Sequence, residues 1–362
     1  MNAQSTARLG VVGLGGWGSF HAARMEGTDA TLVGGIDIDP AARERFEERF
    51  GVPTHENLDE LDETGVDGVI ITTPNQYHEE QAVAAFEAGL GVLIEKPLAH
   101  TLDSAERIVA AAADAPGICI VGFKNRFLPA VEVIKGYERA GRFGEVTHVE
   151  ANYIRRRGIP GRGSWFTDRS SSGGGSLIDI GVHAIDLALY VLDFPRVETV
   201  LGRTRSEFGG REDYTHLEMW GEDAGPDGFD VDDSTTALLC CADGQTVALE
   251  CAWAADREPT DEFVIQGTEA GATLDRGSEE LTIHEARSVG APHFVNAEIE
   301  TRDVNPIAAE QQAFAEAIRT GRPPERNTPE QALVVQRVLD AIQRSSERGK
   351  AVDLRGKAVD LE

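Results

Sequence analysis

The chain has 362 residues, which is long enough for two domains that each bury a core of their own. Apolar residues make up 41% and charged residues 27% of the sequence, so collagen-like and disordered classes are excluded. The formal net charge of -28 repels phosphate backbones and anionic membranes, and neither nucleic acid nor a membrane is an expected partner.

The charge also has a compositional bias, because the sequence contains 62 acidic residues and only five lysines. A surface rich in Asp and Glu and poor in Lys is similar to the proteins of salt-accumulating halophiles, although an acidic protein of an ordinary organism gives the same balance. The four cysteines, Cys119, Cys240, Cys241 and Cys251, show no CxxC spacing, so no structural zinc site and no metal is expected. The N-terminal stretch shows no signal-peptide pattern, and we expect a cytoplasmic protein.

The first third of the chain alternates strands with helices. Strands are predicted over residues 8–14, 30–39, 66–74, 91–97 and 117–123, and helices over residues 17–25, 40–50, 76–89 and 104–115. This alternation predicts a parallel sheet covered on both faces. We therefore expect a doubly wound, dinucleotide-binding Rossmann domain over residues 1–125.

The remaining residues, 126–362, predict a second domain for substrate binding and oligomerisation. Strands are predicted over residues 145–156, 262–275 and 280–286, with a hairpin over residues 234–253 that turns at Asp243-Gly244. Helices are predicted over residues 173–194, 306–319 and 329–349, and residues 221–233 form an acidic loop. The fold class is therefore α/β, with an α+β second domain built on an open, mainly antiparallel sheet.

A glycine pattern, Gly13-x-Gly15-x-x-Gly18, follows the first predicted strand and opens a helix. Glycines there allow a tight turn and the close approach of a pyrophosphate to the backbone. Asp37 ends the second strand 19 residues after Gly18, where a carboxylate can accept from the ribose hydroxyls and repel a 2'-phosphate. The pattern predicts NAD as the cofactor, with NADP as the alternative, and a purely structural glycine turn is the competing interpretation.

Two further strand ends carry polar residues. Thr73, Pro74 and Asn75 follow the third strand, where they could contact the cofactor ribose or simply cap the next helix. Lys96 follows the fourth strand, and Pro97 favours an extended backbone there. Lysine can donate to a substrate oxygen, although for this residue taken alone a solvent-exposed lysine is favoured over a catalytic one. The expected cofactor contacts are Gly13, Leu14, Gly15, Gly16, Trp17, Gly18, Asp37, Thr73, Pro74, Asn75, His78, Glu95 and Lys96, and for His78 a structural role is favoured over catalysis.

The segment SLIDIGVHAID, residues 176–186, combines apolar residues with Asp179, His183 and Asp186. Ser176 and Asp179 match a capping box, which would explain Asp179 as a structural residue. With Tyr190, these three residues recur at spacings of four, three and four, which predicts one polar stripe along an otherwise apolar helix. An Asp one turn before a His can tune that His for proton transfer, so catalysis and buried structural polarity both remain open.

Together the motifs resemble the Gfo/Idh/MocA family, the group of glucose-fructose oxidoreductase and inositol dehydrogenase. The resemblance rests on GVVGLGGWG, TTPNQYH, EKP, GFKNRF, GGGSLIDIGVHAID, DDSTTALL with CAW, and NPIAAEQQAFAEAIRTG, which cover essentially the whole chain. It implies an NAD(P)-dependent dehydrogenase of a sugar, sugar derivative or cyclitol that forms a homodimer or homotetramer. The alternatives within the resemblance are a redox-neutral NAD-dependent glycosidase and a non-catalytic dinucleotide-binding regulator.

The same resemblance implies a catalytic trio of Lys96, Asp179 and His183. His183 would accept the proton of the substrate hydroxyl, and Lys96 would orient that hydroxyl and stabilise charge on its oxygen. It also implies substrate contacts from Lys96, Asn125, Arg126, Tyr153, Arg155, Trp165, Asp179 and His183. Arginines of the basic segment RRRGIPGRGSWF could bind a polyhydroxylated or anionic substrate, or this segment could be a solvated loop. Asp186 is expected to have a structural role.

Overall fold

The computed structural model describes residues 6–62, 64–219 and 221–355, and the chain divides into two compact units. The first unit combines residues 1–127 with residues 305–333, and the second combines residues 128–304 with residues 334–362. Residues 305–333, which the sequence predicts to belong to the second domain, join the first unit because α9 (Pro306–Thr320) buries Phe314 and Ala315 in the core of the first sheet.

The first unit contains, within its described residues, a six-stranded sheet in the order β3-β2-β1-β4-β5-β6. Its strands are β1 (Ala7–Val12), β2 (Ala30–Ile36), β3 (Thr54–His55), β4 (Gly68–Ile71), β5 (Gly91–Glu95) and β6 (Cys119–Gly122), and neighbouring strands within these described residues are parallel. The strand residues Val11, Ile70, Leu93 and Ile120 are completely buried, as expected for a sheet covered on both faces. This unit confirms the predicted Rossmann architecture.

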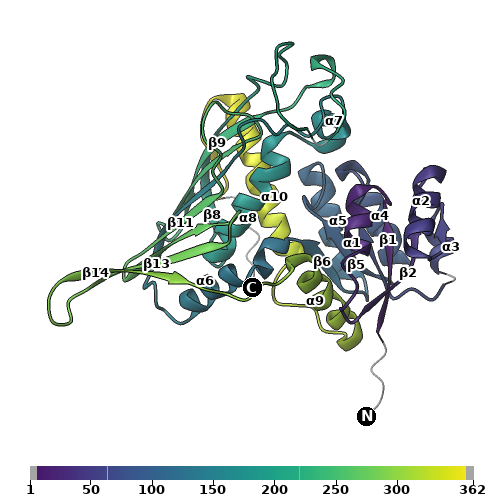
Figure 1. Ribbon diagram of the computed structural model, residues 1–362, viewed down its shortest axis with the longest axis horizontal. Coiled ribbons are helices and arrows are strands. Elements are labelled where there is room, and N and C mark those ends of the chain that lie inside the picture. The colour runs from purple at the N-terminus through teal and green to yellow at the C-terminus, as the bar shows by residue number, and fades with distance from the viewer. Residues whose placement is uncertain (1–5, 63, 220, 356–362) are drawn as a thin grey trace. The chain divides into compact units, whose positions relative to one another are not determined.

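Helices cover this sheet, as Figure 1 shows in purple and blue for the N-terminal part of the chain. They are α1 (Gly16–Ala22), α2 (Pro40–Phe50), α3 (Leu58–Asp62), α4 (His78–Glu87), α5 (Leu102–Asp114) and α9, with short 3-10 turns at Asn75–Tyr77 and Lys124–Phe127. Because β1 lies between β2 and β4, the chain reverses its direction of strand addition at β1. Ligands of doubly wound sheets bind at the carboxyl ends of the strands beside such a reversal.

The second unit is built on a sheet that has nine strands within the described residues, in the order β14-β13-β12-β11-β7-β10-β9-β8-β15. Their bounds are β7 (Val146–Ile154), β8 (Val197–Arg205), β9 (Ser234–Cys241), β10 (Thr246–Ala252), β11 (Glu262–Gly267), β12 (Ala270–Asp275), β13 (Glu280–Arg287), β14 (His293–Ile299) and β15 (Val352–Asp353). Within this described sheet, β7 and β10 form the parallel pair and the other neighbours are antiparallel. The predicted mainly antiparallel sheet is confirmed, including the hairpin of β9 and β10.

The helices of the second unit are α6 (Pro129–Arg139), α7 (Arg169–Ser172), α8 (Val182–Val191) and most of α10 (Pro329–Arg348). Helix α8 packs on β7 and β10, and every residue of α8 is buried. Among the described residues, the segment Arg169–Val191 is long and apolar enough to cross a membrane. Because 89% of its most apolar window is buried inside the protein, a core helix accounts for the same composition.

Candidate active site

The turn after β1 has the geometry that a dinucleotide needs. Gly13 adopts φ +91°, which an L side chain rarely tolerates, and a Cβ on Gly18 would lie 1.9 Å from the Gly13 carbonyl oxygen. A Cβ on Gly15, in contrast, would meet no described atom within 4 Å. The first and third glycines are therefore required by the protein itself, whereas the second leaves open space at the surface. This combination fits a bound pyrophosphate.

Asp37, directly after β2, is hydrogen-bonded to the backbone of this turn. Its Oδ2 accepts a hydrogen bond from the Leu14 backbone N–H at 2.8 Å, and its Oδ1 accepts from the Asp39 N–H at 2.9 Å. The carboxylate is half-buried, so its remaining lone pairs can still accept from a ribose. Asp37 thus lies where the sequence predicts it, beside the glycine turn.

His78 at the start of α4 ties together the loops that follow β4 and β5. Its Nδ1 lies 3.0 Å from the Pro97 carbonyl oxygen, and its Nε2 lies 3.0 Å from the Thr73 carbonyl oxygen. The side chain is 1% exposed, and this burial lowers the pKa of His78. This placement supports the structural interpretation of His78 over contact between its imidazole and a cofactor.

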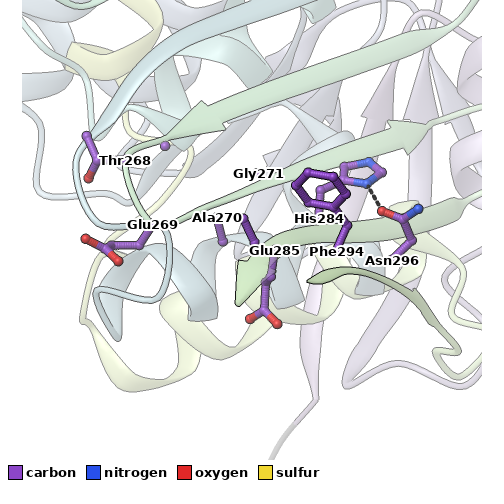
Figure 2. Close-up of a pocket in the computed structure, with 10 residues that line it drawn as sticks. Thr268, Glu269, Ala270, Gly271, His284, Glu285, Phe294 and Asn296 are labelled. Atoms are coloured by element: carbon purple, nitrogen blue, oxygen red, sulfur yellow. Dashed lines mark hydrogen bonds between the residues drawn. The ribbon is translucent and has the colours of Figure 1, made fainter. Parts of the chain in front are cut away.

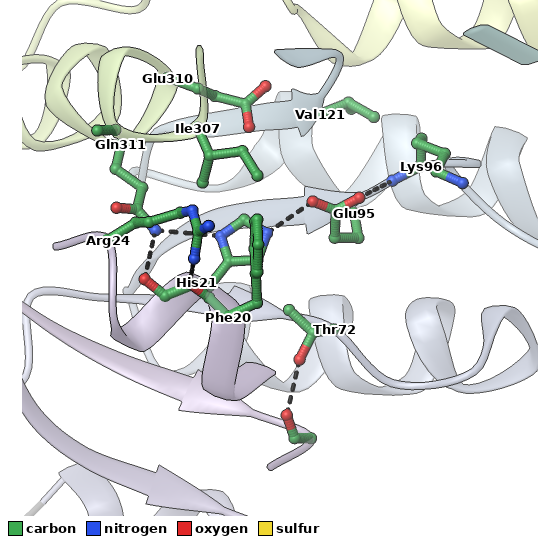
Figure 3. A network of polar contacts seen from close by, with 12 residues as sticks. Phe20, His21, Arg24, Thr72, Glu95, Lys96, Val121, Ile307, Glu310 and Gln311 are labelled. Atoms are coloured by element: carbon green, nitrogen blue, oxygen red, sulfur yellow. Dashed lines mark hydrogen bonds and ion pairs between the residues drawn. The ribbon is translucent and has the colours of Figure 1, made fainter. Parts of the chain in front are cut away.

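Lys96 lies at the carboxyl end of β5, and β5 is separated from β1 by β4 alone. It is therefore at the sheet edge that carries the glycine turn and the Thr73 loop. Its peptide bond with Pro97 is cis. The neighbouring Glu95 carboxylate is directed inward, where it accepts from His21 Nε2 at 2.7 Å and from the Lys96 N–H at 3.1 Å (Figure 3). Burial raises the pKa of Glu95, but the hydrogen bond of His21 and the charge of Lys96 outweigh burial and lower it overall.

Asn125 and Arg126, the two expected substrate contacts that follow β6, are both buried. The guanidinium of Arg126 donates to Gln331 and lies 5.0 Å from the Phe123 ring centroid. Because the Arg126 side chain is completely buried, it is better explained as part of the core of the first unit than as a substrate contact. Trp17, in contrast, is 37% exposed.

In the second unit, the segment that contains Asp179 begins differently from the prediction. Ser176 is helical in backbone conformation and makes no capping bond, so the predicted capping box of Ser176 and Asp179 is wrong. Asp232 takes that role: its carboxylate accepts from the N–H groups of Gly175 and Leu177 and from the Ser176 hydroxyl at 2.7–2.9 Å. Residues Leu177–Gly181 then form a π-helical turn that leads into α8.

This arrangement leaves the Asp179 carboxylate available for other contacts. Its Oδ2 accepts a hydrogen bond from the Trp253 indole N–H at 2.9 Å and lies 4.0 Å from Arg155 Nη1. Arg155 Nη2 also donates to the Tyr153 hydroxyl at 3.1 Å. Asp179, Arg155 and Tyr153, all expected site residues, are therefore brought together within one unit.

Tyr153 lies beside a second guanidinium. Arg276 is 4.4 Å from the Tyr153 ring centroid and forms a two-pronged ion pair with Asp261. Burial raises the pKa of the Tyr153 phenol, but the charges of Arg155 and Arg276 outweigh burial and lower it overall. The phenol is therefore more acidic than an ordinary tyrosine.

The remaining residues of the predicted stripe, His183, Asp186 and Tyr190, lie on α8, with exposed fractions of 8%, 1% and 7%. Asp179 belongs to the preceding π-helical turn, so the stripe crosses a change of helical type. The low exposure of Asp186 agrees with a structural role. Trp165 stacks on Phe166 at a centroid distance of 3.8 Å and is half-buried.

The basic segment after β7 is largely neutralised by acidic residues. Arg156 pairs with Glu258, Arg157 with Asp256 and Arg162 with Asp223. Their charges are therefore balanced within the protein, which weakens the interpretation that these three arginines bind an anionic substrate.

A shallow groove of about 360 Å³ lies on β11 to β14 (Figure 2). His284 at its centre is fixed by Asn296 and Thr273 at 2.9 and 3.0 Å. None of the predicted site residues lines this groove. The described residues contain no group of three or more His, Cys, Asp or Glu that could hold a metal, and the four cysteines are free thiols.

Several residues of these sites were not predicted. They are His21 and Gln311 behind Glu95, Trp253 beside Asp179, Arg276 beside Tyr153, and Asp232 at the start of the π-helical turn. These contacts span at least 50 residues of sequence, and no local spacing carries that information. The exception is His21, which follows the glycine pattern by three residues and could have been found as a polar residue on the inner face of α1.

Comparison with known proteins decides the family. A family model described as an oxidoreductase family with an NAD-binding Rossmann fold matches residues 7–123, and a model of the Gfo/Idh/MocA C-terminal domain matches residues 132–273. A protein of Amycolatopsis mediterranei described as an oxidoreductase subunit of UDP-kanosamine synthase is 34% identical over 274 residues, which is 75% of each chain. The chain belongs to the Gfo/Idh/MocA family.

Other members of this family agree with that assignment. D-glucoside 3-dehydrogenase of Escherichia coli is 29% identical over 80% of this chain and 79% of its own. The solved structure of a levoglucosan dehydrogenase complex with NADH and L-sorbose matches the fold with a TM-score of 0.83 over 96% of this chain and 98% of that chain, at 24% identity. Further relatives bear the names of dehydrogenases of levoglucosan and scyllo-inositol. The protein is thus an oxidoreductase of the Gfo/Idh/MocA family, with NAD as the cofactor of its Rossmann domain.

Proposed function

We propose that this protein oxidises a secondary hydroxyl of a sugar, sugar derivative or cyclitol, with NAD as the hydride acceptor. NAD supplies one chemical function, the acceptance of a hydride at its nicotinamide ring. The chain would hold it through the glycine turn after β1, through Asp37 and through the loops that follow β4 and β5. NADP is the alternative cofactor, and Asp37 favours NAD because its carboxylate repels a 2'-phosphate.

The reacting groups in this proposal are Lys96, Asp179 and His183. His183 removes the proton from the substrate hydroxyl while the C–H bond of the same carbon breaks and its hydrogen leaves as hydride. Lys96 donates a hydrogen bond to the substrate oxygen and stabilises the negative charge that develops on it. Asp179 binds the same substrate or orients His183. The products are the ketone, the reduced nicotinamide and one proton, so electrons and atoms balance.

The observation that carries the proposal is the position of Lys96. It lies at the carboxyl edge of the first sheet, on a strand separated from the nucleotide-binding turn by β4 alone. A cationic donor at that edge suits a substrate oxygen next to a nicotinamide, because both bind where doubly wound sheets bind their ligands. In the second unit, the fixed Asp179 carboxylate and the nearby Tyr153 and Arg155 supply polar groups that suit a polyhydroxylated substrate.

A substrate panel tests the proposal directly. Purified protein is incubated with pentoses, hexoses, glycosides and inositols, each with NAD or NADP, and the absorbance of reduced nicotinamide is followed. We expect reduction with at least one member, and loss of that activity in Lys96→Met and His183→Asn. Glycoside hydrolysis without net reduction would replace dehydrogenation by the redox-neutral reaction, and dinucleotide binding with no turnover of any kind would favour a regulator.

We also propose that the protein works in concentrated salt as a homodimer or homotetramer in the cytoplasm. The support for the salt requirement is the net charge of -28, whose self-repulsion is screened when the Debye length falls to about 3 Å at about 1 M salt. The melting temperature should rise between about 0.1 and 2 M KCl, and light scattering gives the assembly size. A melting temperature that is independent of salt would contradict the salt requirement.

A further inference from the structure

A chain of hydrogen bonds within the first unit leads from Gln311 through His21 and Glu95 to the Lys96 backbone (Figure 3). His21 on α1 is completely buried, and its Nε2 lies 2.7 Å from Glu95 Oε1. On the other side of the ring, Gln311 Nε2 on α9 lies 3.1 Å from His21 Nδ1 and 3.0 Å from the His21 carbonyl oxygen. Glu95 in turn accepts from the Lys96 N–H.

These hydrogen bonds determine which nitrogen of His21 carries the proton. The Gln311 side chain faces a backbone carbonyl, which only accepts hydrogen bonds, so its amide nitrogen and not its oxygen must point there. The same nitrogen therefore donates to His21 Nδ1, which must be unprotonated. The proton of the ring is then on Nε2, where it donates to Glu95. His21 is a neutral donor in this arrangement and does not cancel the charge of Glu95.

The Glu95 carboxylate is consequently an anion whose cationic neighbour is Lys96. Its side chain is 7% exposed, and a Cβ on Gly122 would lie 3.0 Å from its Cδ and Oε1, so the carboxylate is closely packed. The electrostatic influence of Lys96 and the hydrogen bond of the Trp17 side chain both favour the charged form of Glu95.

Other titratable groups face this site from neighbouring elements. His78 on α4 interacts electrostatically with Glu95, but burial lowers the pKa of His78 and favours its neutral form. Glu310 on α9 is completely buried and accepts from Asn327 at 2.9 Å. Arg24 on α1 lies over the Phe20 ring at 3.1 Å. Lys96 is therefore the cation adjacent in sequence to Glu95, and the Lys96 backbone N–H donates a hydrogen bond to the Glu95 carboxylate.

We propose that His21 and Gln311 are positioning residues that hold Glu95 as a buried anion, and that this anion keeps Lys96 a protonated donor toward the substrate oxygen. The inference rests on the proposed function, in which Lys96 contacts the substrate. The hydrogen bonds connect three parts of the chain: α1, which begins in the glycine turn, β5, and α9, which follows α1 by almost 300 residues. The return of α9 to the first unit thereby completes the environment of Lys96.

The pH dependence of kcat/KM tests this inference in the full-length protein. Glu95→Gln keeps the shape of the side chain and removes its charge, so Lys96 should lose its proton more readily. Removing a neighbouring opposite charge makes a protonated amine easier to deprotonate, so the alkaline limb should move to lower pH by about one unit. Gln311→Met removes the donor to Nδ1, which allows His21 to become charged and cancel Glu95, and should move the limb in the same direction by less.

Gln312→Met is the matched control. Gln312 is the next residue on α9, and its amide bonds with Asp29 at the surface, away from Glu95. We expect its pH profile to equal that of the wild type. Melting temperature and NAD affinity are measured for every variant. If Glu95→Gln does not fold, the inference is tested by comparing the alkaline limbs of Gln311→Met and Gln312→Met.

The outcomes separate this inference from the proposed function. An unshifted alkaline limb in folded Glu95→Gln, or in folded Gln311→Met where Glu95→Gln does not fold, would overturn the inference while leaving the dehydrogenase intact. A lower melting temperature with an unchanged profile would reduce the network to a structural role. Full activity of Lys96→Met would instead contradict the proposed role of Lys96 itself.

Discussion

Trp253 provides a sharp test of how Asp179 is held. It lies directly after β10, is completely buried, and donates its indole N–H to Asp179 Oδ2 at 2.9 Å. Trp253→Phe removes this donor and keeps most of the buried ring. A hydrogen bond to a charged acceptor contributes about 1.5–3 kcal/mol. Since about 1.4 kcal/mol corresponds to a tenfold change in rate, complete loss in the transition state would lower kcat/KM by about 10- to 150-fold. Arg155, whose Nη1 lies 4.0 Å from Asp179 Oδ2, still helps to orient the Asp179 carboxylate, so we expect a decrease of kcat/KM in the lower half of this range.

The assay compares steady-state kcat and KM of Trp253→Phe, Asp179→Asn and the double variant at saturating NAD. If Trp253 acts through Asp179, its substitution should cost little more once Asp179 is already Asn. A thermal melt controls for the packing loss, which should be well below the about 3–5 kcal/mol of truncation to Ala. Wild-type kcat/KM in Trp253→Phe, with Asp179→Asn inactive, would refute this reasoning.

Five further substitutions test the geometry. Gly15→Ala should leave the melting temperature unchanged, because its Cβ meets no described atom within 4 Å, but should weaken NAD binding in calorimetry at least about tenfold. Gly18→Ala, whose Cβ would lie 1.9 Å from a carbonyl oxygen, should lower both the melting temperature and the NAD affinity. Equal losses of melting temperature in the two variants would contradict this. Asp37→Ser should raise the NADP-to-NAD ratio of kcat/KM, and an unchanged ratio would contradict repulsion of the 2'-phosphate. Asp232→Ala should lower the free energy of unfolding in urea by about 3 kcal/mol or more, since it leaves several buried donors without an acceptor. The folded protein lowers the pKa of Glu95 from 4.5 to about 2, so its stabilisation is complete above pH 4.5 and is lost as the pH falls toward 2; Glu95→Gln should flatten this part of the stability curve.

The sequence predicts those parts of the structure whose signals are local. Strands β4 and β6 are uninterrupted apolar runs because both faces are buried, and the hairpin of β9 and β10 turns at Asp243-Gly244, where Gly244 adopts φ +86°. The glycine turn and Asp37 are equally local, because a backbone requirement fixes Gly13 and Gly18, and Asp37 directly follows β2. These features were therefore visible as patterns of neighbouring residues.

The remainder depends on contacts between distant residues. Ser176 and Asp179 have the spacing of a capping box, but the Asp232 carboxylate, 56 residues away from Ser176, accepts from the Ser176 hydroxyl and the Leu177 N–H instead. The position of α9 depends on how Phe314 packs against the first core, which its amphipathic pattern does not specify. Likewise, Gln311 and His21 are separated by 290 residues, and no spacing rule connects them.

The central claim is that a hydride leaves the carbinol carbon of a sugar or cyclitol for the nicotinamide. The most direct measurement uses the best substrate of the panel with deuterium at that carbon, and mass spectrometry of the reduced nicotinamide formed. We expect one deuterium per reduced nicotinamide in the wild type, and no reduced nicotinamide from Lys96→Met. Reduced nicotinamide without deuterium, or deuterium released to water, would contradict direct hydride transfer.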